Sequence, residues 1–560
     1  TYTLTATTPN ECSSAISIEV EIHVAPAIAD QNLTVCEGST LTLTCGIDGL
    51  AEYHWTGPNS FVSNLQNPIV SNNASLDMQG NYILTVADEF GCTASAVSNV
   101  EVIPTPQNAE FTLPSCIYID EVYEFTNLGN NDDSFHYTWD FGDGIISNFT
   151  VAEHIFKNEG YHCITLTVEN QCGISSYSPP KPVFLYPNKC ACTYEYDAVE
   201  NIEITGDVFW DPTIKTVKKD IIIETNATLT IDNQTVQFGP EGRIIVKQGG
   251  GLFITKSSTL RGLEDCKNMW QGIEVWGKYN EDANSEEQGR IIVGYGKNEI
   301  KDAHIGILAG ARNMDNICYF DLSSAFNAEY SGGLITVINN TENNDNWLKF
   351  INNGIGIKLL KKHSDHLSTG AEHGYQRMDF HTKLGEELFD RNYSTIYGYN
   401  PYPNIHNPWA GKANSLQRTD VGIWMEHINP YPIYHSNFSN VQHGILAYQK
   451  SVFEVLGGYF KNADYGILTF KSKFKITKSK FDKDDYGIVA HDTYSHIAGN
   501  DFDNSDYGIL TYNSNYDVFT SNFTNVNHGI ETHNSDFNVE ESNFTNSIHG
   551  ILAYNSNFNV

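Results

Sequence analysis

The sequence has no long apolar run and comparatively few basic side chains. Without a run of about 18 apolar residues it holds no transmembrane helix, and no charged-then-apolar leader stands at Thr1, so we expect neither anchor nor signal peptide within this stretch. Lys and Arg total 33 against 68 Asp and Glu, a net charge of −35. Because phosphates and anionic lipids attract basic residues, this balance argues against nucleic acid and anionic membranes as partners and favours a well-solvated surface.

Motifs that would commit the chain to an enzyme are also missing. There is no Gly-rich phosphate loop, no nucleophile elbow and no Cys-x-x-Cys pair. The carboxylate pairs Glu386-Glu387 and Asp484-Asp485 are adjacent in sequence, so on a strand their side chains point to opposite faces. A glycosidase pair must instead face one cleft from separate strands.

A Gly-Ile pair recurs near the end of the chain at intervals of 22 and then 21 residues, and a phenylalanine stands six residues before each glycine. The glycines are Gly444, Gly466, Gly487, Gly508, Gly529 and Gly550; the phenylalanines are Phe438, Phe460, Phe481, Phe502, Phe523 and Phe544. A repeat this short, rich in strand-forming residues and without helical periodicity, predicts three short strands per unit and a parallel β-helix. The consensus of leucine-rich repeats is missing.

Stacked coils place equivalent residues directly above one another, about 4.8 Å apart. The phenylalanines therefore predict an aromatic column and the isoleucines after each glycine an aliphatic one. A second aromatic series keeps the period, with a serine in one place: Phe453, Phe474, Ser495, Tyr516, Phe537 and Phe558. The glycine suits a corner that needs positive φ or close backbone approach.

Eleven cysteines, most of them in the first 200 residues, indicate an oxidising compartment and disulfides within small β-modules. The spacing from Tyr2 to Cys12 repeats that from Tyr82 to Cys92. We therefore interpret residues 1–25 as the C-terminal remnant of a module of which residues 26–104 are a complete copy. A partner of Cys12 would then lie upstream.

Residues 26–104 contain Trp55 and the stretch Asp77-x-x-Gly80-x-Tyr82 between Cys36 and Cys92, and they resemble an immunoglobulin-like β-sandwich. That stretch is similar to the tyrosine-corner region of the fold. Leu84 stands where the second core cysteine would be, so Cys45 has no expected core partner. We expect a Cys36–Cys92 bridge instead.

Residues 105–187 contain Trp139-Asp-Phe-Gly-Asp-Gly144 and the later alternating strand Ile164-Thr-Leu-Thr-Val168. This region resembles a PKD domain, a β-sandwich of extracellular proteins. The resemblance favours a Cys116–Cys172 bridge. Asp140 and Asp143 are candidate calcium ligands, although turn aspartates commonly accept hydrogen bonds from local backbone N–H groups. The pairing of six other cysteines stays open: Cys45, Cys163, Cys190, Cys192, Cys266 and Cys318.

Strand-like runs begin after a Pro-rich connector, so we assign residues 188–560 to the β-helix. Its early coils hold the Trp-rich stretch Met269-Trp-Gln-Gly-Ile-Glu-Val-Trp-Gly277. The order of Ig-like, PKD and right-handed, pectin-lyase-like β-helix modules resembles large secreted or cell-surface proteins of Bacteroidota that are exported by type nine secretion. The resemblance implies an adhesin. The sorting domain of such proteins is not found in this sequence, and Val560 falls in mid-coil, so we expect further coils and modules.

Two candidate sites are predicted on the β-helix. The Gly-Ile interval widens before Gly422, which predicts an inserted loop at about 358–420 with ligand-stacking aromatics, among them Tyr375, Tyr399, Tyr402 and Trp409; the alternative is that these rings pack the loop onto the solenoid. Asp464, Asp485 and Asp506 stand two residues before successive repeat glycines. Stacked carboxylates must splay into water, share protons or bind a cation such as calcium.

The sequence thus predicts an all-β protein of tandem Ig-like and PKD sandwiches followed by a parallel β-helix with 21-residue coils. It favours a non-catalytic structural or adhesive protein, secreted or on the outer cell surface, that binds extracellular surfaces or polysaccharides. The expected cofactor is none, or calcium. The alternative is a β-helix polysaccharide lyase or glycoside hydrolase with accessory PKD and Ig-like modules.

Overall fold

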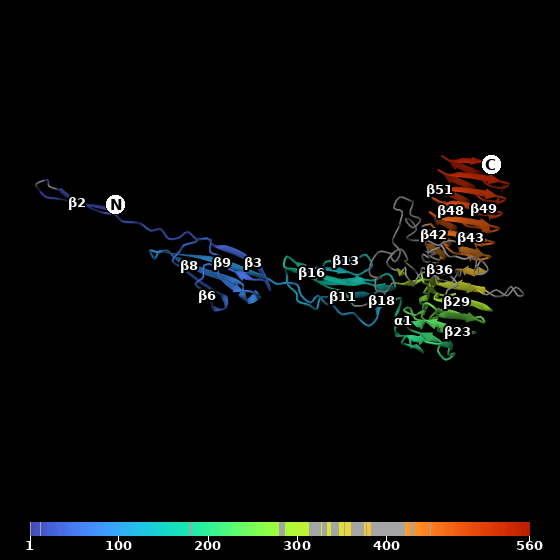
Figure 1. Cartoon of the computed structure of the whole chain (residues 1–560), viewed down its shortest axis with the longest axis horizontal. Coiled ribbons are helices and arrows are strands. Elements are labelled where there is room, and N and C mark those ends of the chain that lie inside the picture. The colour runs from blue at the N-terminus through green and yellow to red at the C-terminus, as the bar shows by residue number, and fades with distance from the viewer. Residues whose placement is uncertain are drawn as a thin grey trace.

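The computed structural model describes residues 2–9, 11, 13–179, 182–278, 286–312, 326–327, 333–337, 347–351, 353–359, 375–376, 378–381, 421–426, 431–448 and 450–559. These residues are almost entirely β-structure. Figure 1 shows two sandwich modules in a row behind an N-terminal hairpin, followed by a stack of coils that runs across the direction of the row. The expected fold class is confirmed.

The chain begins with an antiparallel hairpin of β1 (Tyr2–Thr7) and β2 (Ser13–Ile18). The Ig-like module comes next, with strands β3 (Gln31–Cys36), β4 (Leu41–Thr42), β5 (Glu52–Gly57), β6 (Phe61–Ser63), β7 (Ile69–Ser71), β8 (Gly80–Ala87) and β9 (Thr93–Ile103) and the short 3-10 helices η1 (Pro58–Ser60) and η2 (Leu76–Met78). One sheet has the order β3-β9-β8-β5-β6, and β4 pairs with β7.

The core of the Ig-like module forms around Trp55, Tyr82 and Leu84, all buried. The Tyr82 hydroxyl donates a hydrogen bond to the Met78 carbonyl, four residues upstream, at 2.9 Å, which is the geometry of a tyrosine corner. Cys45 is buried in this core as a free thiol, as the leucine at position 84 predicts.

The PKD region is a second sandwich, with strands β10 (Ile117–Tyr118), β11 (Val122–Thr126), β12 (His136–Asp140), β13 (Ile146–Ser147), β14 (Val151–Ile155), β15 (Gly160–His162), β16 (Thr165–Asn170), β17 (Gly173–Tyr177) and β18 (Val183–Tyr186). Trp139, Phe141 and Phe156 fill its core and are completely buried. The short helix α1 (Lys189–Thr193) leads into the solenoid.

The solenoid has three parallel faces. Within the described residues the longest sheet has 13 strands, which we call the first sheet: β19 (Ile202–Ile204), β22 (Ile221–Ile223), β25 (Arg243–Val246), β28 (Trp270–Val275), β31 (Ala303–Ala309), β36 (Ile355–Leu359), β39 (Val421–Glu426), β42 (His443–Tyr448), β45 (Tyr465–Phe470), β48 (Tyr486–His491), β51 (Tyr507–Tyr512), β54 (His528–His533) and β57 (His549–Tyr554).

The second face contains β21 (Thr216–Val217), β24 (Thr235–Phe238), β27 (Thr259–Gly262), β30 (Lys297–Lys301), β35 (Trp347–Ile351), β38 (Met378–His381), β41 (Asn437–Ser439), β44 (Tyr459–Lys461), β47 (Lys480–Asp482), β50 (Asp501–Asp503), β53 (Asn522–Thr524) and β56 (Asn543–Thr545).

The third face consists of two sheets. The earlier sheet contains β20 (Asp207–Phe209), β23 (Thr228–Asp232), β26 (Gly251–Thr255), β29 (Arg290–Val293) and β34 (Leu334–Val337). The later sheet contains β37 (Tyr375–Gln376), β40 (Tyr431–Tyr434), β43 (Val452–Leu456), β46 (Lys473–Thr477), β49 (Tyr494–Ala498), β52 (Asn515–Phe519), β55 (Asp536–Glu540) and β58 (Asn557–Asn559). A separate short pair joins β32 (Ala311–Arg312) to β33 (Phe326–Asn327).

The predicted core columns are confirmed. Neighbouring rings in the column from Phe438 to Phe544 stack with centroids 4.7 to 4.8 Å apart. The isoleucines after the repeat glycines are direct strand partners from Ile445 to Ile551. In the second aromatic series, buried Ser495 takes the expected place between Phe474 and Tyr516.

The repeat glycines allow the backbone and a phenylalanine ring of the next coil to approach closely, which is the second of the two roles predicted for them. A Cβ at Gly444 would lie 2.5 Å from the Gly466 carbonyl oxygen and 2.6 Å from the ring of Phe460. The positive φ angles fall elsewhere in each coil, on residues such as Asn462, Asn504 and Asn525. Asparagine tolerates the left-handed region better than most residues do, which accounts for its frequency at these corners.

The region 358–420 is more than one inserted loop, because two of its short segments are strands of a regular coil. β37 pairs in parallel with β40, and β38 pairs with both β35 and β41. The residues between β36 and β37, and most of those from β38 to β39, lie outside the described residues. The insertion is therefore divided into two segments by a rung of the solenoid.

Both expected disulfides are wrong. Cys36 is bonded to Cys172, Cys116 to Cys192, and Cys190 to Cys266. Cys36 ends β3 and is level with Ile103 in the parallel pairing of β3 with β9, whereas Cys92 directly precedes β9. Eleven residue steps separate Cys92 from Ile103, roughly 36 Å at the rise of a β-strand, and a disulfide needs Cα atoms within about 7 Å. Cys36 and Cys92 therefore stand at opposite ends of one sandwich.

Candidate functional site

The junction between the Ig-like and PKD modules is held by a covalent bond. Cys36 and Cys172 bring their Cα atoms within 5.4 Å across 136 residues of sequence. Hydrogen bonds flank the disulfide: the Asn170 side-chain amide donates to the Pro104 carbonyl at 2.8 Å, and the Thr105 hydroxyl donates to the Glu37 carbonyl at 3.0 Å. The connecting peptide at Pro104 and Thr105 is thus hydrogen-bonded to both modules beside the disulfide.

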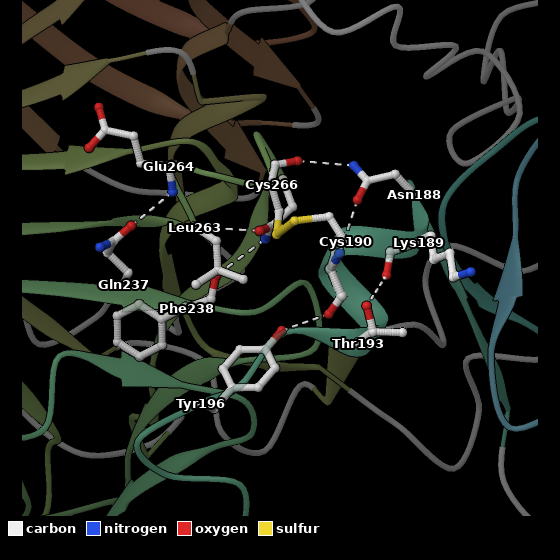
Figure 2. Close-up of a disulfide and its surroundings, with 12 residues drawn as sticks. Asn188, Lys189, Cys190, Thr193, Tyr196, Gln237, Phe238, Leu263, Glu264 and Cys266 are labelled. Carbon is white, nitrogen blue, oxygen red and sulfur yellow. Dashed lines mark hydrogen bonds between the residues drawn. A yellow bond between two sulfur atoms is a disulfide. The ribbon is translucent and has the colours of Figure 1, made fainter.

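Two disulfides hold the junction between the PKD module and the solenoid. Cys116 of the PKD module is bonded to Cys192 of α1, and Cys190 of the same helix is bonded to Cys266 of the solenoid. Figure 2 shows the second bond with its surroundings, in which the Asn188 side-chain amide donates to the Cys266 carbonyl at 2.9 Å. The same Asn188 accepts a hydrogen bond from the Ala191 N–H and so caps the helix.

Buried aromatic side chains fill this second junction. Tyr186 of β18, whose hydroxyl is hydrogen-bonded to the Glu241 carboxylate of the solenoid, packs in one cluster with Phe184 and Leu263. Burial and the neighbouring Glu241 raise the pKa of Tyr186, so this phenol stays protonated and donates to the carboxylate. The contact adds an apolar interface to the two disulfides.

The PKD turn aspartates accept hydrogen bonds within the module. Asp140 accepts from the Gly142 N–H at 2.9 Å, and Asp143 accepts from the Ile145 N–H at 3.1 Å. The second oxygen of Asp143 lies 2.8 Å from Nε2 of His154, with both side chains buried. These contacts are the local backbone pairing that the sequence offered as the alternative to calcium.

The aspartate column lies along one edge of the first sheet. Asp464 is half-buried, whereas Asp485 and Asp506 are exposed, and the Asn527 amide donates to Asp506 at 2.9 Å. Across the described part of the chain, no group of three His, Cys, Asp or Glu side chains is placed to hold a metal ion. Calcium at Asp464, Asp485 and Asp506, or at Asp140 and Asp143, stays a prediction.

The predicted ligand-binding loop falls almost wholly outside the described residues. Tyr399, Tyr402 and Trp409 lie in that part of the chain, and Tyr375 begins β37. Their role in binding stays a prediction.

Two aromatic ladders on the outer face of the first sheet were not foreseen from the sequence. One stands directly before the repeat glycines (His443, Tyr465, Tyr486, Tyr507, His528 and His549), and the other four residues after them (Tyr448, Phe470, His491, Tyr512, His533 and Tyr554). Between them lies an aliphatic row of Leu446, Leu468, Val489 and Leu510, in an apolar cluster separate from the solenoid core. The 21-residue period, applied to these two positions, would have found both ladders.

Glu531 interrupts the aliphatic row and connects the two ladders. Its carboxylate oxygens lie 3.0 Å from Nδ1 of His528 in one ladder and 3.0 Å from Nε2 of His533 in the other. Burial raises the pKa of Tyr512, and the charge of Glu531 raises it further. Near the C-terminal end of the first sheet, Glu531, His528 and His533 thus form a polar cluster on an otherwise apolar outer face.

The stacking geometry limits what the ladders can bind. Neighbouring rings from Tyr448 to Tyr554 are 4.7 to 5.0 Å apart and nearly parallel, so each interior ring has both faces covered by other rings. Sugar rings stack on open aromatic faces, and here the faces are occupied. The ladders stabilise the coils, and they offer a ligand ring edges, hydroxyl groups and imidazole nitrogens.

Comparisons with known protein families agree with the module order. Residues 25–102 match the immunoglobulin domain family, residues 105–180 match the PKD domain family, and residues 405–560 match the family described as periplasmic copper-binding protein (NosD). No sequence among the curated proteins matches this chain.

Among solved structures, the chain is similar to three molecules over part of its length. The amphioxus IgVJ-C2 molecule is 14% identical over 27% of this chain and 98% of its own, with a TM-score of 0.21. Domains 3–5 of the extracellular part of Drosophila OTK are 14% identical over 33% of this chain and 70% of their own, with a TM-score of 0.22. Murine CEACAM1b is 11% identical over 26% and 92%, with a TM-score of 0.20.

The modules together define the class of protein. Ig-like, PKD and NosD-type β-helix domains in one chain fit an extracellular or periplasmic cell-surface protein. No helix in the described part of the chain has the length and apolar character needed to span a bilayer.

Proposed function

We propose that this chain is a non-catalytic structural or adhesive protein of the outer cell surface, in which braced β-sandwiches hold a β-helix out toward extracellular surfaces or polysaccharides. The observation that carries the proposal is the position of the disulfides. Each of the three described bonds joins neighbouring parts of the chain: Cys36–Cys172, Cys116–Cys192 and Cys190–Cys266. Independent catalytic modules need no such bracing, whereas a stalk that must keep its direction does.

The order of modules further supports a surface protein of the kind found in Bacteroidota, secreted by the type nine route. This assignment rests on the sequence resemblance of the Trp139-Asp-Phe-Gly-Asp-Gly144 hairpin and the Trp-rich coil at 269–277, together with the family matches. Copper, which the description of the NosD family names, has no part in the proposal.

A polysaccharide panel tests the proposal. The protein is passed over immobilised acidic and neutral polysaccharides, and the eluted material is assayed for new reducing or unsaturated ends. Adhesion predicts that at least one polysaccharide retains the protein and that no new ends form. New ends would instead establish the alternative, a polysaccharide lyase or glycoside hydrolase.

The predicted loop provides the matched variants for that experiment. If the aromatics of the 358–420 region bind the polysaccharide, Trp409→Ala and Tyr402→Ala lower retention. Tyr494→Ala is the control, because Tyr494 is a 56% exposed tyrosine of β49 outside that region. Equal retention of all three variants would remove the loop from the proposal.

A further inference from the structure

Each sandwich has one cysteine at either end. In the PKD module, Cys172 directly precedes β17 and is bonded to the Ig-like module, while Cys116 directly precedes β10 and is bonded to helix α1. In the Ig-like module, Cys36 is bonded to the PKD module. Cys92, at the opposite end, is a half-buried free thiol.

Cys92 is the structural counterpart of Cys172. Both directly precede the second strand of a hairpin, β9 for Cys92 and β17 for Cys172. The backbone N–H of each donates to a side-chain oxygen of the preceding turn: that of Cys92 to Asp88, four residues back, and that of Cys172 to Asn170, two residues back, both at 2.8 Å. The sequence positions are also equivalent, since Cys172 stands 80 residues after Cys92, and Cys116 stands 80 residues after Cys36.

The N-terminal hairpin repeats the hairpin that contains Cys92. Tyr2 pairs with Ile18 in β1–β2, and Tyr82 pairs with Ser98 in β8–β9. Each residue of the second pair stands 80 positions after its counterpart in the first, so the two hairpins have the same register. Leu4, Ile16 and Ile18 lie on one face of the hairpin and are 71%, 62% and 60% exposed. In β8–β9 the equivalent face, with Tyr82 and Leu84, is buried in the sandwich core. The hairpin thus has the register and the apolar face of the last two strands of an Ig-like module.

The thiol of Cys92 faces the chain that arrives from this hairpin. Its Sγ lies 3.9 Å from the carbonyl oxygen of His23, in the segment between β2 and β3. The His23 ring stacks on Phe90, in the same turn as Cys92, with centroids 3.6 Å apart. The end of the module that carries Cys92 is therefore the end directed toward the preceding module, as the end carrying Cys172 is directed toward the Ig-like module.

We propose that Cys92 is the attachment point of a further intermodule disulfide, whose partner is the cysteine equivalent to Cys36 in an Ig-like module that precedes this one and ends with β1–β2. Cys36 shows the geometry of that partner, because it makes the same bond to Cys172. The inference extends the proposed stalk: the arrangement of Cys36–Cys172, in which the first cysteine of one sandwich bonds the hairpin cysteine of the next, is repeated one module upstream.

The bond forms by two thiol–disulfide exchanges. The Cys92 thiol or its partner loses a proton and attacks a disulfide-bearing oxidant, such as oxidised glutathione or a periplasmic dithiol oxidase, and releases one thiol of that oxidant. The second protein thiolate then attacks the mixed disulfide and releases the other thiol. Two electrons and two protons pass from the two cysteines to the oxidant.

Disulfide mapping of the native full-length polypeptide tests the proposal. Free thiols are alkylated first in the folded protein and then after unfolding without reduction, and non-reduced proteolytic peptides are identified by mass spectrometry. We expect the Cys92 peptide to be linked to a peptide from upstream of Thr1 and alkylated at neither step. Cys45, buried and free, is the internal control and should be alkylated only after unfolding. Alkylated Cys92, or Cys92 bonded to Cys12 or Cys45, would overturn the proposal.

A chimaeric chain gives an independent second test. A copy of residues 26–81 placed directly before Tyr2 would complete the preceding module, because Tyr2 has the register of Tyr82. The expected product has the copied Cys36 bonded to Cys92, and this bond is lost in Cys92→Ser while the native Cys36–Cys172, Cys116–Cys192 and Cys190–Cys266 bonds are retained. A folded chimaera with that cysteine free would contradict the inference. Neither mapping result depends on polysaccharide retention, so failure here is distinguishable from failure of the adhesive proposal.

Discussion

Cys36 of the Ig-like module and Cys172 of the PKD module are bonded across 136 residues of sequence, although each has another cysteine within its own module. The bond encloses most of both sandwiches in one covalent loop. The Cys190–Cys266 bond likewise encloses the first coils of the solenoid, across 76 residues. The cysteines thus stabilise the relative placement of modules, and each sandwich core is held by packing around a buried tryptophan.

Asp484 is expected to make stability depend on pH. It is 2% exposed in a corner of the solenoid, where it accepts a hydrogen bond from the Ala463 N–H at 2.8 Å, and burial raises its pKa well above the ordinary value of 3.8. Because the folded state holds this proton more tightly than the unfolded state, stability falls as pH rises above about 4.

Asp484→Asn tests this expectation. The amide keeps the acceptor for Ala463 and removes the charge, so the melting temperature at pH 7 should rise and its decline between pH 4 and pH 7 should flatten. Thermal unfolding followed by circular dichroism measures both effects. Asp485→Asn, at the exposed neighbour, is the control, and an equal gain in that variant would argue against burial as the cause.

His491 is expected to act in the opposite direction. It stacks between Phe470 and Tyr512 at centroid distances of 4.9 and 4.7 Å, and burial lowers its pKa from 6.5 to about 4. The folded state binds this proton less readily than the unfolded state, so the stability it supports is present above pH 6.5 and is lost as pH falls toward 4. His491→Tyr should remove that loss while it keeps an aromatic ring at this place in the ladder. The exposed His549→Tyr serves as control, and identical acid unfolding of both variants and the parent would contradict the prediction.

Gly508 is expected to tolerate no side chain. A Cβ there would lie 2.6 Å from the Gly529 carbonyl oxygen and 2.7 Å from the Phe523 ring, inside a stack that is fixed on both sides. Gly508→Ala should therefore cost about 1–3 kcal/mol, the range for overpacking. Hydrogen exchange of the amides in β51 and β54 measures the local opening free energy. Gly206→Ala is the matched control, because no atom lies within 4 Å of its added Cβ; equal protection in both variants would refute the prediction.

The β-helix could be predicted from the sequence because its order is local and periodic. Phe438 and its successors are 21 or 22 residues apart, so a single register places every member of the column. The outer ladders keep the same period, but Tyr, Phe and His alternate at these positions, which hides the series from a search for one residue type.

The disulfides could not be paired from the sequence, because cysteines are bonded where the ends of two neighbouring modules meet. Which cysteine stands at which end of its module follows only from the strand pairing. Cys36 and Cys92 flank one complete sandwich, and only the parallel alignment of β3 with β9 shows that they stand at opposite ends. The 80-residue spacing of Cys12, Cys92 and Cys172 was present in the sequence. It indicates equivalent positions in successive modules, but it is compatible with bonds within a module as well as between modules.

Pulling on single molecules tests the braced stalk most directly. With the disulfides intact, tension between the chain ends passes from Cys36 to Cys172 and from Cys190 to Cys266, so the enclosed residues cannot extend. Once all of the disulfides are reduced, the 136 residues from Cys36 to Cys172 are free to extend, a gain of roughly 460 Å at about 3.4 Å per residue. We predict that this increment is absent under oxidising conditions and present after reduction. The Cys36→Ser, Cys172→Ser double variant should give a smaller gain under oxidising conditions, because Cys116–Cys192 still bypasses most of the PKD module. Full extension of both sandwiches in the oxidised protein would contradict the account.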